Sequence, residues 1–336
     1  MPTTPDVRVG IVSYDTAGLL DRALASLPDA LGSLTAEVVV VDNASHDSSV
    51  QVALGHPGVE VLTNDVNVGY ARAMNKALAG TTARALIALN PDTEAPPGSL
   101  EKLVITLDEQ PRAGLVAPKL VDSNGLPRRS VYPYPGFVQA LETGLVPRRW
   151  RRDGFSRGGS PIRMLRRRWA VGAVHCIRNA ALGIEPPYAT QWFMYVEDIE
   201  LCWRLERNGW HNLLREDVQV VHHGNAAGIQ RWGEGAALEL RSLPNIYEWL
   251  SSFRSPFQAR ATALVNFVSV GTKRLALAAG AAAAKGPRVE QWGNRAHELG
   301  LLAQYHAQVL RAGVRVTGGD RSGTRPRADA ESRPES

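Results

Sequence analysis

Two acidic motifs, far apart in the sequence, carry residue types suited to acid–base and phosphate chemistry. The segment Phe193–Trp210 (FMYVEDIELCWRLERNGW) places adjacent carboxylates, Glu197 and Asp198, at the start of an amphipathic helical pattern. A second motif, Leu89–Asp92 (LNPD), lies about a hundred residues earlier. A carboxylate at a helix start can simply cap the helix, because its oxygens accept backbone N–H groups that have no helical partner. The second motif nevertheless favours a site assembled from distant segments.

The elements that must position these acids alternate between strands and helices. Helical patterns cover residues 69–79, 99–109 and 19–27, the last of which Pro28 is expected to end. The strand patterns between them cover residues 7–13, 37–42, 59–62, 85–89 and 114–116. This alternation predicts an α/β fold, with a mostly parallel sheet covered by helices.

Polar residues follow each of the first four strands. Ligands of such sheets bind beyond the carboxyl ends of the strands, so clusters at one edge predict a binding site there. The clusters are Ser13-Tyr14-Asp15, Asp42-Asn43-Ala44-Ser45, Asn64-Asp65 and Asn90-Pro91-Asp92.

The rest of the chain is less regular. Residues 127–168 are rich in Pro, Gly and Arg, which predicts an irregular excursion. Structure is expected to resume over 169–177, and residues 218–221 resemble a short strand that ends at His222 and His223. Helical patterns begin at Ala236 and are interrupted at Pro244, Pro256 and Pro287, and the polar tail over 317–336 is expected to be disordered.

The net charge of +5 has a local source. Between Arg148 and Arg168 there are nine arginines and one acid, Asp153. Such a run is either a solvated basic loop or a patch for phosphate groups, belonging to an acceptor or to a membrane surface. Nucleic acid is disfavoured because aromatic residues are not interleaved with the arginines.

Cysteine usage and hydropathy bear on the cellular compartment. Cys176 and Cys202 form no CxxC motif, which agrees with a reducing cytoplasm. The N-terminus lacks the pattern of a signal peptide. Lys273 and Arg274 interrupt the apolar segment Ala261–Ala284, so a buried or bundle-forming helix is favoured over a membrane span, with a helix at the membrane interface as the alternative.

Five motifs, taken in order, resemble those of family 2 glycosyltransferases, and in particular a bacterial rhamnosyltransferase-like branch. The resemblance extends over roughly residues 7–225 and more weakly over the helices that follow. The motifs are VSYDT (Val12–Thr16), VDNASHDSS (Val41–Ser49), NVGYARAMNKAL (Asn67–Leu78), LNPDTE (Leu89–Glu94) and MYVEDIELCWRL (Met194–Leu205).

The resemblance implies a GT-A nucleotide-diphospho-sugar transferase-like fold over 1–235, with a C-terminal helical extension over 236–316. The implied reaction is inverting transfer of a sugar, best assigned as L-rhamnose from dTDP-rhamnose, to a hydroxyl of a saccharide or polyprenyl-linked acceptor in cell-envelope biosynthesis. The implied location is the cytoplasm, with peripheral contact at the inner face of the cell membrane. A catalytically inactive nucleotide-sugar-binding or scaffold protein of the same fold is the alternative.

The resemblance also assigns roles to individual residues. Asp198 would be the general base and Glu197 a supporting acid. Donor binding would fall to the polar strand-end residues and to the third motif, together with Arg204, which alternatively pairs with Glu200 one helical turn away. The donor-binding set is Ser13, Tyr14, Asp42, Asn43, Asn67, Gly69, Asn75, Asn90, Asp92 and Arg204. For Asp42 and Asn43, an Asx turn is the competing interpretation.

A divalent cation, Mg²⁺ or Mn²⁺, is implied at Asp92 and His222, with His223 as the fallback ligand. The family commonly has an Asp-x-Asp-like motif at this point, whereas this chain has Asn90 in the first acidic position. A neutral amide oxygen is a weaker ligand, so the metal would depend more on substrate phosphates. The segment 183–191 (GIEPPYATQ) also departs from the family pattern, which keeps the inactive alternative open.

Overall fold

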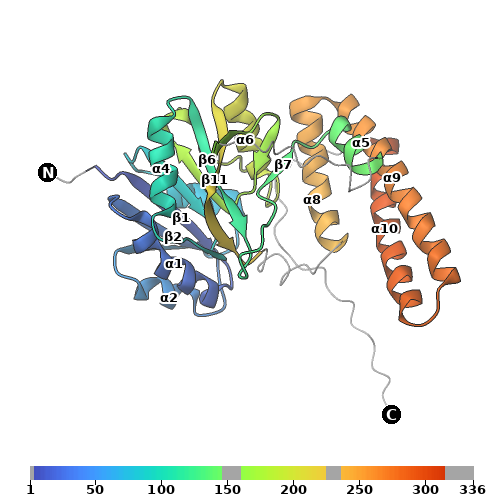
Figure 1. Ribbon diagram of the computed structural model, residues 1–336, viewed down its shortest axis with the longest axis horizontal. Coiled ribbons are helices and arrows are strands. Elements are labelled where there is room, and N and C mark those ends of the chain that lie inside the picture. The colour runs from blue at the N-terminus through green and yellow to red at the C-terminus, as the bar shows by residue number, and fades with distance from the viewer. Residues whose placement is uncertain (1–3, 146–159, 225–235, 315–336) are drawn as a thin grey trace, which may run out of the picture.

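The computed structural model describes residues 4–145, 160–224 and 236–314. Nine strands within these ranges form one mixed sheet, whose spatial order runs from β3 to β5 with β8 paired to β11 (Figure 1). In that order the strands are β3 (Val59–Thr63), β2 (Ala36–Asp42), β1 (Val7–Ser13), β4 (Ala85–Leu89), β10 (Val174–Arg178), β6 (Ala113–Val121), β11 (His211–His222), β5 (Thr93–Glu94) and β8 (Ile162–Met164). Strands β1–β4 are parallel, and β10 is antiparallel to both β4 and β6.

Helices cover both faces of the sheet. Strand β2 shows why, because Val39 and Val41 point into one apolar core while Val40 points into the other. The first core contains apolar residues of α3 and α6, and the second contains those of α1, α2 and α4. These helices are α1 (Ala17–Leu31), α2 (Ser49–Gly55), α3 (Tyr70–Leu78), α4 (Ser99–Glu109) and α6 (Glu197–Arg207).

The predicted α/β fold is confirmed, but several boundaries were wrong. Helix α1 runs through Pro28, because its buried stripe of Leu20, Leu24, Leu27 and Leu31 continues across the proline and outweighs one lost backbone hydrogen bond. Strands β6 and β11 are much longer than their apolar runs. Their extra length comes from pairing with each other and with β8, which local pattern does not reveal.

The prediction that residues 127–168 are irregular is wrong for much of the described part. Strand β7 (Val131–Pro133) pairs with β9 (Arg168–Ala170) in a second, two-stranded sheet. Helix α5 (Phe137–Leu145) follows β7 in the chain. It packs against the C-terminal helix α9, more than a hundred residues later in the sequence (Figure 1). Residues 146–159, which hold five of the nine arginines of the basic run, lie outside the described residues.

The C-terminal helices are α8 (Ala236–Trp249), its π-helical continuation η3 (Leu250–Arg254), α9 (Pro256–Ala283) and α10 (Pro287–Ala312). The predicted interruptions at Pro256 and Pro287 are confirmed, because a new helix begins at each, whereas the one at Pro244 is wrong, because Pro244 lies inside α8. Buried residues of these helices, such as Trp249 and Val309, join the same core as α3 and α6. Among the described residues, no helix is long and apolar enough to cross a membrane. The tail over 317–336 lies outside the described residues.

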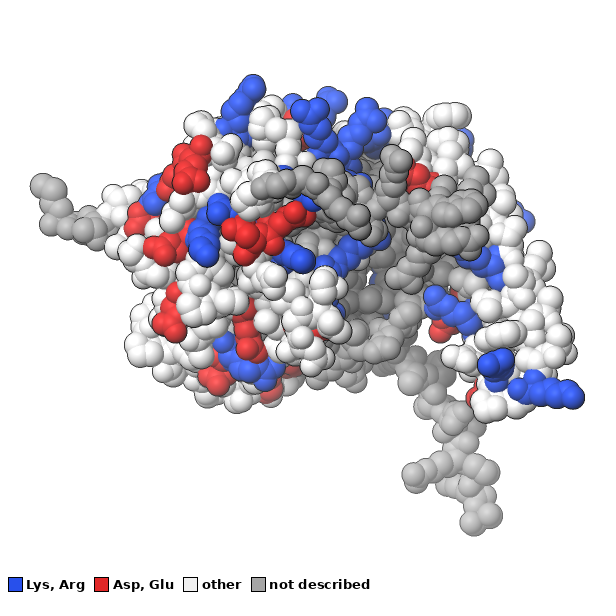
Figure 2. Space-filling model, in the orientation of Figure 1, with Lys and Arg blue, Asp and Glu red and all other residues white. Residues whose placement is uncertain are grey.

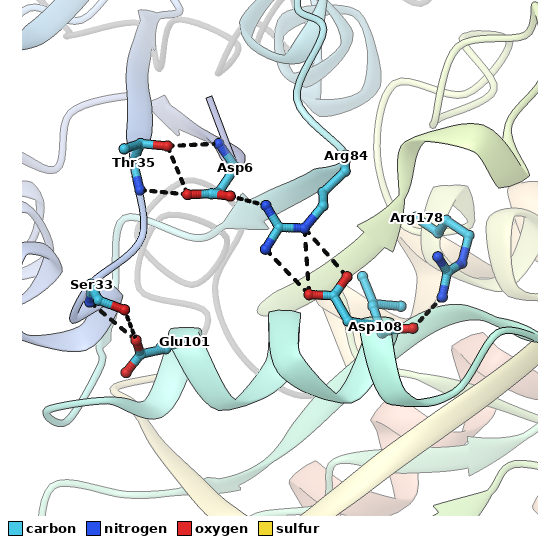
Figure 3. A network of polar contacts seen from close by, with 8 residues as sticks. Asp6, Ser33, Thr35, Arg84, Glu101, Asp108 and Arg178 are labelled. Atoms are coloured by element: carbon cyan, nitrogen blue, oxygen red, sulfur yellow. Dashed lines mark hydrogen bonds and ion pairs between the residues drawn. The ribbon is translucent and has the colours of Figure 1, made fainter. Parts of the chain in front are cut away.

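A polar network joins the strand starts, at the end of the sheet opposite the predicted site (Figure 3). Arg84, which precedes β4, forms ion pairs with Asp6 before β1 and with Asp108 of α4. Hydrogen bonds from the hydroxyl and N–H of Thr35, followed by Arg84, lower the pKa of Asp6 to about 2. The starts of β1, β2 and β4 are thus held together by residues that take no part in the predicted site.

Candidate active site

A cleft of about 700 Å³ opens at the carboxyl ends of β1, β2 and β4. The described structure brings eight of the sequence-predicted site residues to its wall: Tyr14, Asn43, Asn67, Asn90, Asp92, Glu197, Asp198 and His222. The others, Ser13, Asp42, Gly69, Asn75 and Arg204, do not line it.

Asn43 organises one end of the cleft. Its Nδ2 donates to Asn67 Oδ1 at 2.9 Å, and its Oδ1 accepts from Val68 N at 3.1 Å and from Asn64 Nδ2 at 3.0 Å. This side chain therefore joins the end of β2, the end of β3 and the loop before α3. Asn67 is held at the cleft wall by a network rather than by its own loop alone.

Three of the predicted residues outside the cleft have local partners instead. Ser13 is fully buried, with its hydroxyl 2.9 Å from that of Thr16. Asp42 accepts from Ser45 N, three residues on, at 3.0 Å, which is a local side-chain to backbone hydrogen bond of the kind found in turns. Arg204 pairs with Glu200 at 2.9 Å, one turn earlier in α6, and also donates to the carbonyl of Pro187 at 2.7 Å. For Asp42 and Arg204, the local alternative matches the contacts.

Asp92 and His222 lie together at another wall. Their Oδ1 and Nε2 atoms are 3.4 Å apart, and the side chains are 8% and 13% exposed. The antiparallel pairing of β5 with β11 brings them together, because Thr93 lies opposite His222. His223, the fallback ligand, points elsewhere and pairs with Glu94 at 2.7 Å.

The Asp92–His222 pair fits a divalent cation. Nε2 of His222 is buried without a hydrogen-bond partner among the described residues, so this nitrogen remains available as a ligand. Two ligand atoms of one octahedral Mg²⁺ or Mn²⁺ lie about 3 Å apart, close to the observed separation. No group of three or more acidic, His or Cys side chains in the described ranges is arranged to hold a metal. Oxygens of a substrate diphosphate are of the kind that would complete such a coordination shell.

The two adjacent carboxylates occupy the start of α6 with different contacts. Asp198 accepts from Gly172 N at 3.3 Å and from Ile199 N at 2.8 Å, while Glu197 accepts from Val196 N at 2.9 Å. Removal from bulk water, followed by repulsion from Glu197, raises the pKa of Asp198 to about 8. Burial also raises the pKa of Glu197. The pair is thus tuned toward the range of a general base.

The segment that leads into α6 docks on the start of α3. Phe193 O accepts from Tyr70 N at 3.1 Å, and Gly69 beside it has φ +87°. A Cβ on Gly69 would lie 2.6 Å from Phe193 O, so a side chain at this position would collide with the backbone. The missing side chain of Gly69 therefore allows the backbone at Phe193 to pack against the start of α3. Tyr195, which lines the cleft, has φ +78°, a strained conformation for a bulky residue.

A second anchor holds the same segment. Asn75 of α3 receives a hydrogen bond from Tyr188 N at 3.0 Å and donates to Tyr188 O at 2.7 Å. The Tyr188 ring is buried, and its hydroxyl lies 3.1 Å from His175 Nδ1. Because His175 Nε2 lies 3.1 Å from the Ala170 carbonyl, which only accepts, Nε2 carries the proton and Nδ1 accepts from Tyr188. Burial lowers the pKa of His175 to about 4, so the ring is neutral.

Comparison with known proteins identifies the chain. The family model described as glycosyl transferase family 2 matches residues 8–170. Residues 8–170 of this chain are a family 2 glycosyltransferase domain. Its sequence is 29% identical over 236 residues to the N-acetylglucosaminyl-diphospho-decaprenol L-rhamnosyltransferase of Mycobacterium tuberculosis, covering 63% of this chain and 74% of that protein. It is 24% identical over 222 residues to the low-salt glycan biosynthesis hexosyltransferase Agl10 of Haloferax volcanii, covering 65% and 67%.

Among solved structures, the glycosyltransferase resembles the mannosyltransferase PcManGT from Pyrobaculum calidifontis, determined with GDP-Man and Mn²⁺. The TM-score is 0.51 at 17% identity, covering 91% of this chain and 88% of that one. The mostly parallel sheet flanked by helices is accordingly the GT-A fold, as the sequence motifs predicted.

The sequence motifs missed several residues of the cleft wall. Tyr132 and Trp169 stack at 5.2 Å between centroids, and the Arg129 guanidinium lies 4.2 Å from the centre of the Tyr132 ring. The Arg128 guanidinium lies against Gly224, which has no Cβ to block it. No motif marks these positions, because pairing of β7 with β9 assembles them. Of the predicted basic run, the described arginines do not line the cleft, and Arg163 pairs with Glu216 at 3.0 Å.

The close approach at Gly69 predicts a stability effect. We expect Gly69→Ala to lower the free energy of unfolding by about 2–4 kcal/mol, because it adds backbone strain and a collision with Phe193 O. Gly58→Ala is the control, since Gly58 has φ +77° but open space around its missing Cβ. Urea unfolding of both variants measures the difference. Equal losses in the two variants would show that the collision with Phe193 does not matter.

The contacts of Asn75 predict that its role is structural. Asn75→Ala should lower the free energy of unfolding by about 2–4 kcal/mol, because both backbone groups of Tyr188 lose their partner. At a temperature where this variant stays folded, its affinity for a nucleotide sugar should match that of the unchanged protein. Asn90→Ala, at the cleft wall, should show the reverse pattern. Equal loss of donor affinity in the two variants would contradict this assignment.

Proposed function

We propose that this glycosyltransferase is inverting, depends on a divalent cation, and moves L-rhamnose from dTDP-rhamnose to a hydroxyl of a saccharide or lipid-linked acceptor. The observation that carries the proposal is the placement of Asp198 in the same cleft as the Asp92–His222 pair. A base and a diphosphate-neutralising group in one cleft are what direct displacement at a sugar C1 requires. The name of the mycobacterial L-rhamnosyltransferase supports the choice of sugar.

Asp198 takes the proton in the proposed mechanism. The acceptor oxygen bonds to C1 as its proton passes to Asp198, and the C1–O bond to the diphosphate breaks with its electron pair on the leaving oxygen. Hydrogen bonds from Gly172 N and Ile199 N fix the orientation of the carboxylate. Glu197 supports the base, because its nearby charge adds to desolvation in raising the pKa of Asp198.

The opposite side of the cleft would hold the donor. A divalent cation bound by Asp92 and His222 would offset the charge that develops on the leaving diphosphate. The Arg128 guanidinium lies against Gly224, which follows His222 by two residues in the chain. Arg128 would therefore add a second positive charge on this side of the cleft. Tyr14, Asn43 and Asn67, which line the cleft at the ends of β1 and β2 and before α3, would contact the nucleotide.

The acceptor is assigned to the remaining end of the cleft. Trp169 lies three residues before Gly172, whose N–H holds Asp198, so the Tyr132–Trp169 stack leads toward the base. Aromatic faces suit the apolar faces of sugar rings, and Arg129 beyond them suits a phosphate. This arrangement supports a saccharide carried on a diphosphate-linked lipid, at the cytoplasmic face of the membrane.

Replacing the base should separate transfer from binding. We expect Asp198→Asn to reduce transfer by about 10²–10⁴-fold while nucleotide-sugar affinity is kept, because only proton removal is lost. In the unchanged enzyme kcat/KM should rise about tenfold per pH unit below pH 8 and level off above it, since a base with a raised pKa works only when deprotonated. Asp198→Asn should lack this rise.

Glu200→Gln is the control for that experiment, because Glu200 is also buried in α6 but lies outside the cleft. It should keep the rise with pH. An Asp198→Asn variant with undiminished transfer would refute the assignment of the base. Donor binding without any transfer by the unchanged protein would favour the inactive nucleotide-sugar-binding protein that Asn90 leaves open.

Metal-dependent donor binding can be measured by thermal unfolding. A ligand at a hundred times its Kd stabilises the fold by about 2.7 kcal/mol, so dTDP-rhamnose with Mn²⁺ should raise the melting temperature. His222→Ala should abolish the part of the rise that depends on Mn²⁺. His223→Ala should retain it, because His223 pairs with Glu94 instead. Absence of any rise with dTDP-, UDP- or GDP-sugars would rule out the donor class.

A further inference from the structure

One face of α9 presents an unbroken apolar stripe. Phe257, Leu264, Val268 and Leu275 are spaced by seven, four and seven residues, which places them within about 40° of one another around the helix. They are 79%, 53%, 48% and 71% exposed. The stripe is about 27 Å long at the rise of an α-helix. Four aligned apolar side chains at such exposure are a surface without a partner among the described residues.

The opposite face of α9 explains why the stripe is not needed for folding. Ala259, Thr262, Ala263 and Ser269 are buried there, and α9 packs against α5 and α10. Gly144 of α5 allows this contact, because a Cβ on it would lie 3.0 Å from Ser269. The helix is therefore already anchored on one side, and the stripe faces away from that packing.

Positive charge accompanies the stripe. Between Glu248 and Glu290 there are six arginines and lysines and no acidic residue. Arg260 and Arg274 lie on the same flank of the stripe by helical spacing, and both are exposed. Figure 2 shows blue Lys and Arg side chains at the lower right of the molecule, where Figure 1 places the turn between α9 and α10. Apolar residues bordered by arginine are what a helix lying in the interface of an anionic membrane requires.

We propose that the α9 stripe docks this glycosyltransferase on the surface of an anionic lipid bilayer. A second copy of the chain fits less well, because pairing two stripes would bring like charges together, and one row of four side chains is narrow beside the about 800 Å² per partner of a stable dimer. The proposal deepens the proposed function and rests on it in one respect, since a lipid-linked acceptor would lie in the same bilayer.

Vesicle co-sedimentation of the full chain tests the proposal. The unchanged protein should pellet with vesicles of phosphatidylcholine and phosphatidylglycerol, and less with phosphatidylcholine alone. The variant Leu264→Gln/Val268→Gln/Leu275→Gln should lower the partition coefficient by about a hundredfold, because three apolar side chains no longer enter the interface. Arg260→Gln/Arg274→Gln should weaken binding to the anionic vesicles only.

Leu54→Gln/Ile105→Gln is the matched control, because it removes exposed apolar side chains from α2 and α4 and should leave sedimentation unchanged. The proposal is overturned if the unchanged protein stays in solution with anionic vesicles. It is equally overturned if the stripe variant pellets normally. It is also overturned if sedimentation velocity shows a smaller oligomer for the stripe variant than for the unchanged protein, because the stripe would then join two copies of the chain. Transfer to a short-chain soluble acceptor, assayed in parallel, should be unaffected by the stripe variant. Its absence in the unchanged protein would count against the proposed function and not against membrane docking.

Discussion

The active site depends on the grip of helix α3 on the segment that carries the base. Tyr70 N binds the carbonyl of Phe193 where Gly69 leaves room, and Asn75 binds both backbone groups of Tyr188. These contacts join parts of the chain more than a hundred residues apart. Because α3 also packs on β1 and β2, the grip fixes the proposed base relative to the strand ends that line the rest of the cleft.

Asp198 shows how two opposing effects are decided. A carboxylate at a helix start is expected to stay ionised, because backbone N–H groups and the helix dipole favour its charge. Gly172 N and Ile199 N do lower its pKa, but desolvation and the neighbouring Glu197 raise it by more. Val196, the N-cap residue of α6, caps nothing with its side chain. The local N–H groups therefore orient Asp198, while its surroundings set its basicity.

Sequence reasoning succeeded where local pattern and structure coincide. The buried strands β1, β2 and β4 and the helices α3 and α4 were found from periodicity, and strand-end position placed Tyr14, Asn43 and Asn90 at the cleft. It did not anticipate that the Asn75 amide binds both backbone groups of Tyr188, whereas the Arg204–Glu200 pair was one of the two contacts it offered for Arg204. Nothing in the sequence around Asn75 distinguishes a contact with a distant backbone segment from one with a ligand.

The same limit explains the missed end of the cleft. Arg129, Tyr132 and Trp169 lie in a segment whose Pro, Gly and Arg content indicates a loop. They are brought together by strand pairing between residues 35 to 39 positions apart, in which Val131 lies opposite Ala170 and Tyr132 opposite Trp169. Short strands of this kind have too few residues for periodicity to be detected. Only the tertiary structure shows that Tyr132, Trp169 and the Arg129 guanidinium lie at one wall of the cleft.

The C-terminal helices do more than extend the catalytic domain. The Trp203 ring on α6 packs edge-on against Trp249 of α8 at 5.6 Å, and Arg254 of η3 lies 4.6 Å from the centre of the same ring. Asn245 of α8 donates to Met194 O at 2.8 Å, just before the acidic pair. Helix α8, which contacts the base-bearing segment, continues through η3 into α9, which bears the apolar stripe. Buried residues of α8 and α9 therefore belong to one packed core. A bilayer bound at the stripe would therefore meet the cleft at a fixed orientation, as transfer to an acceptor anchored in that bilayer requires.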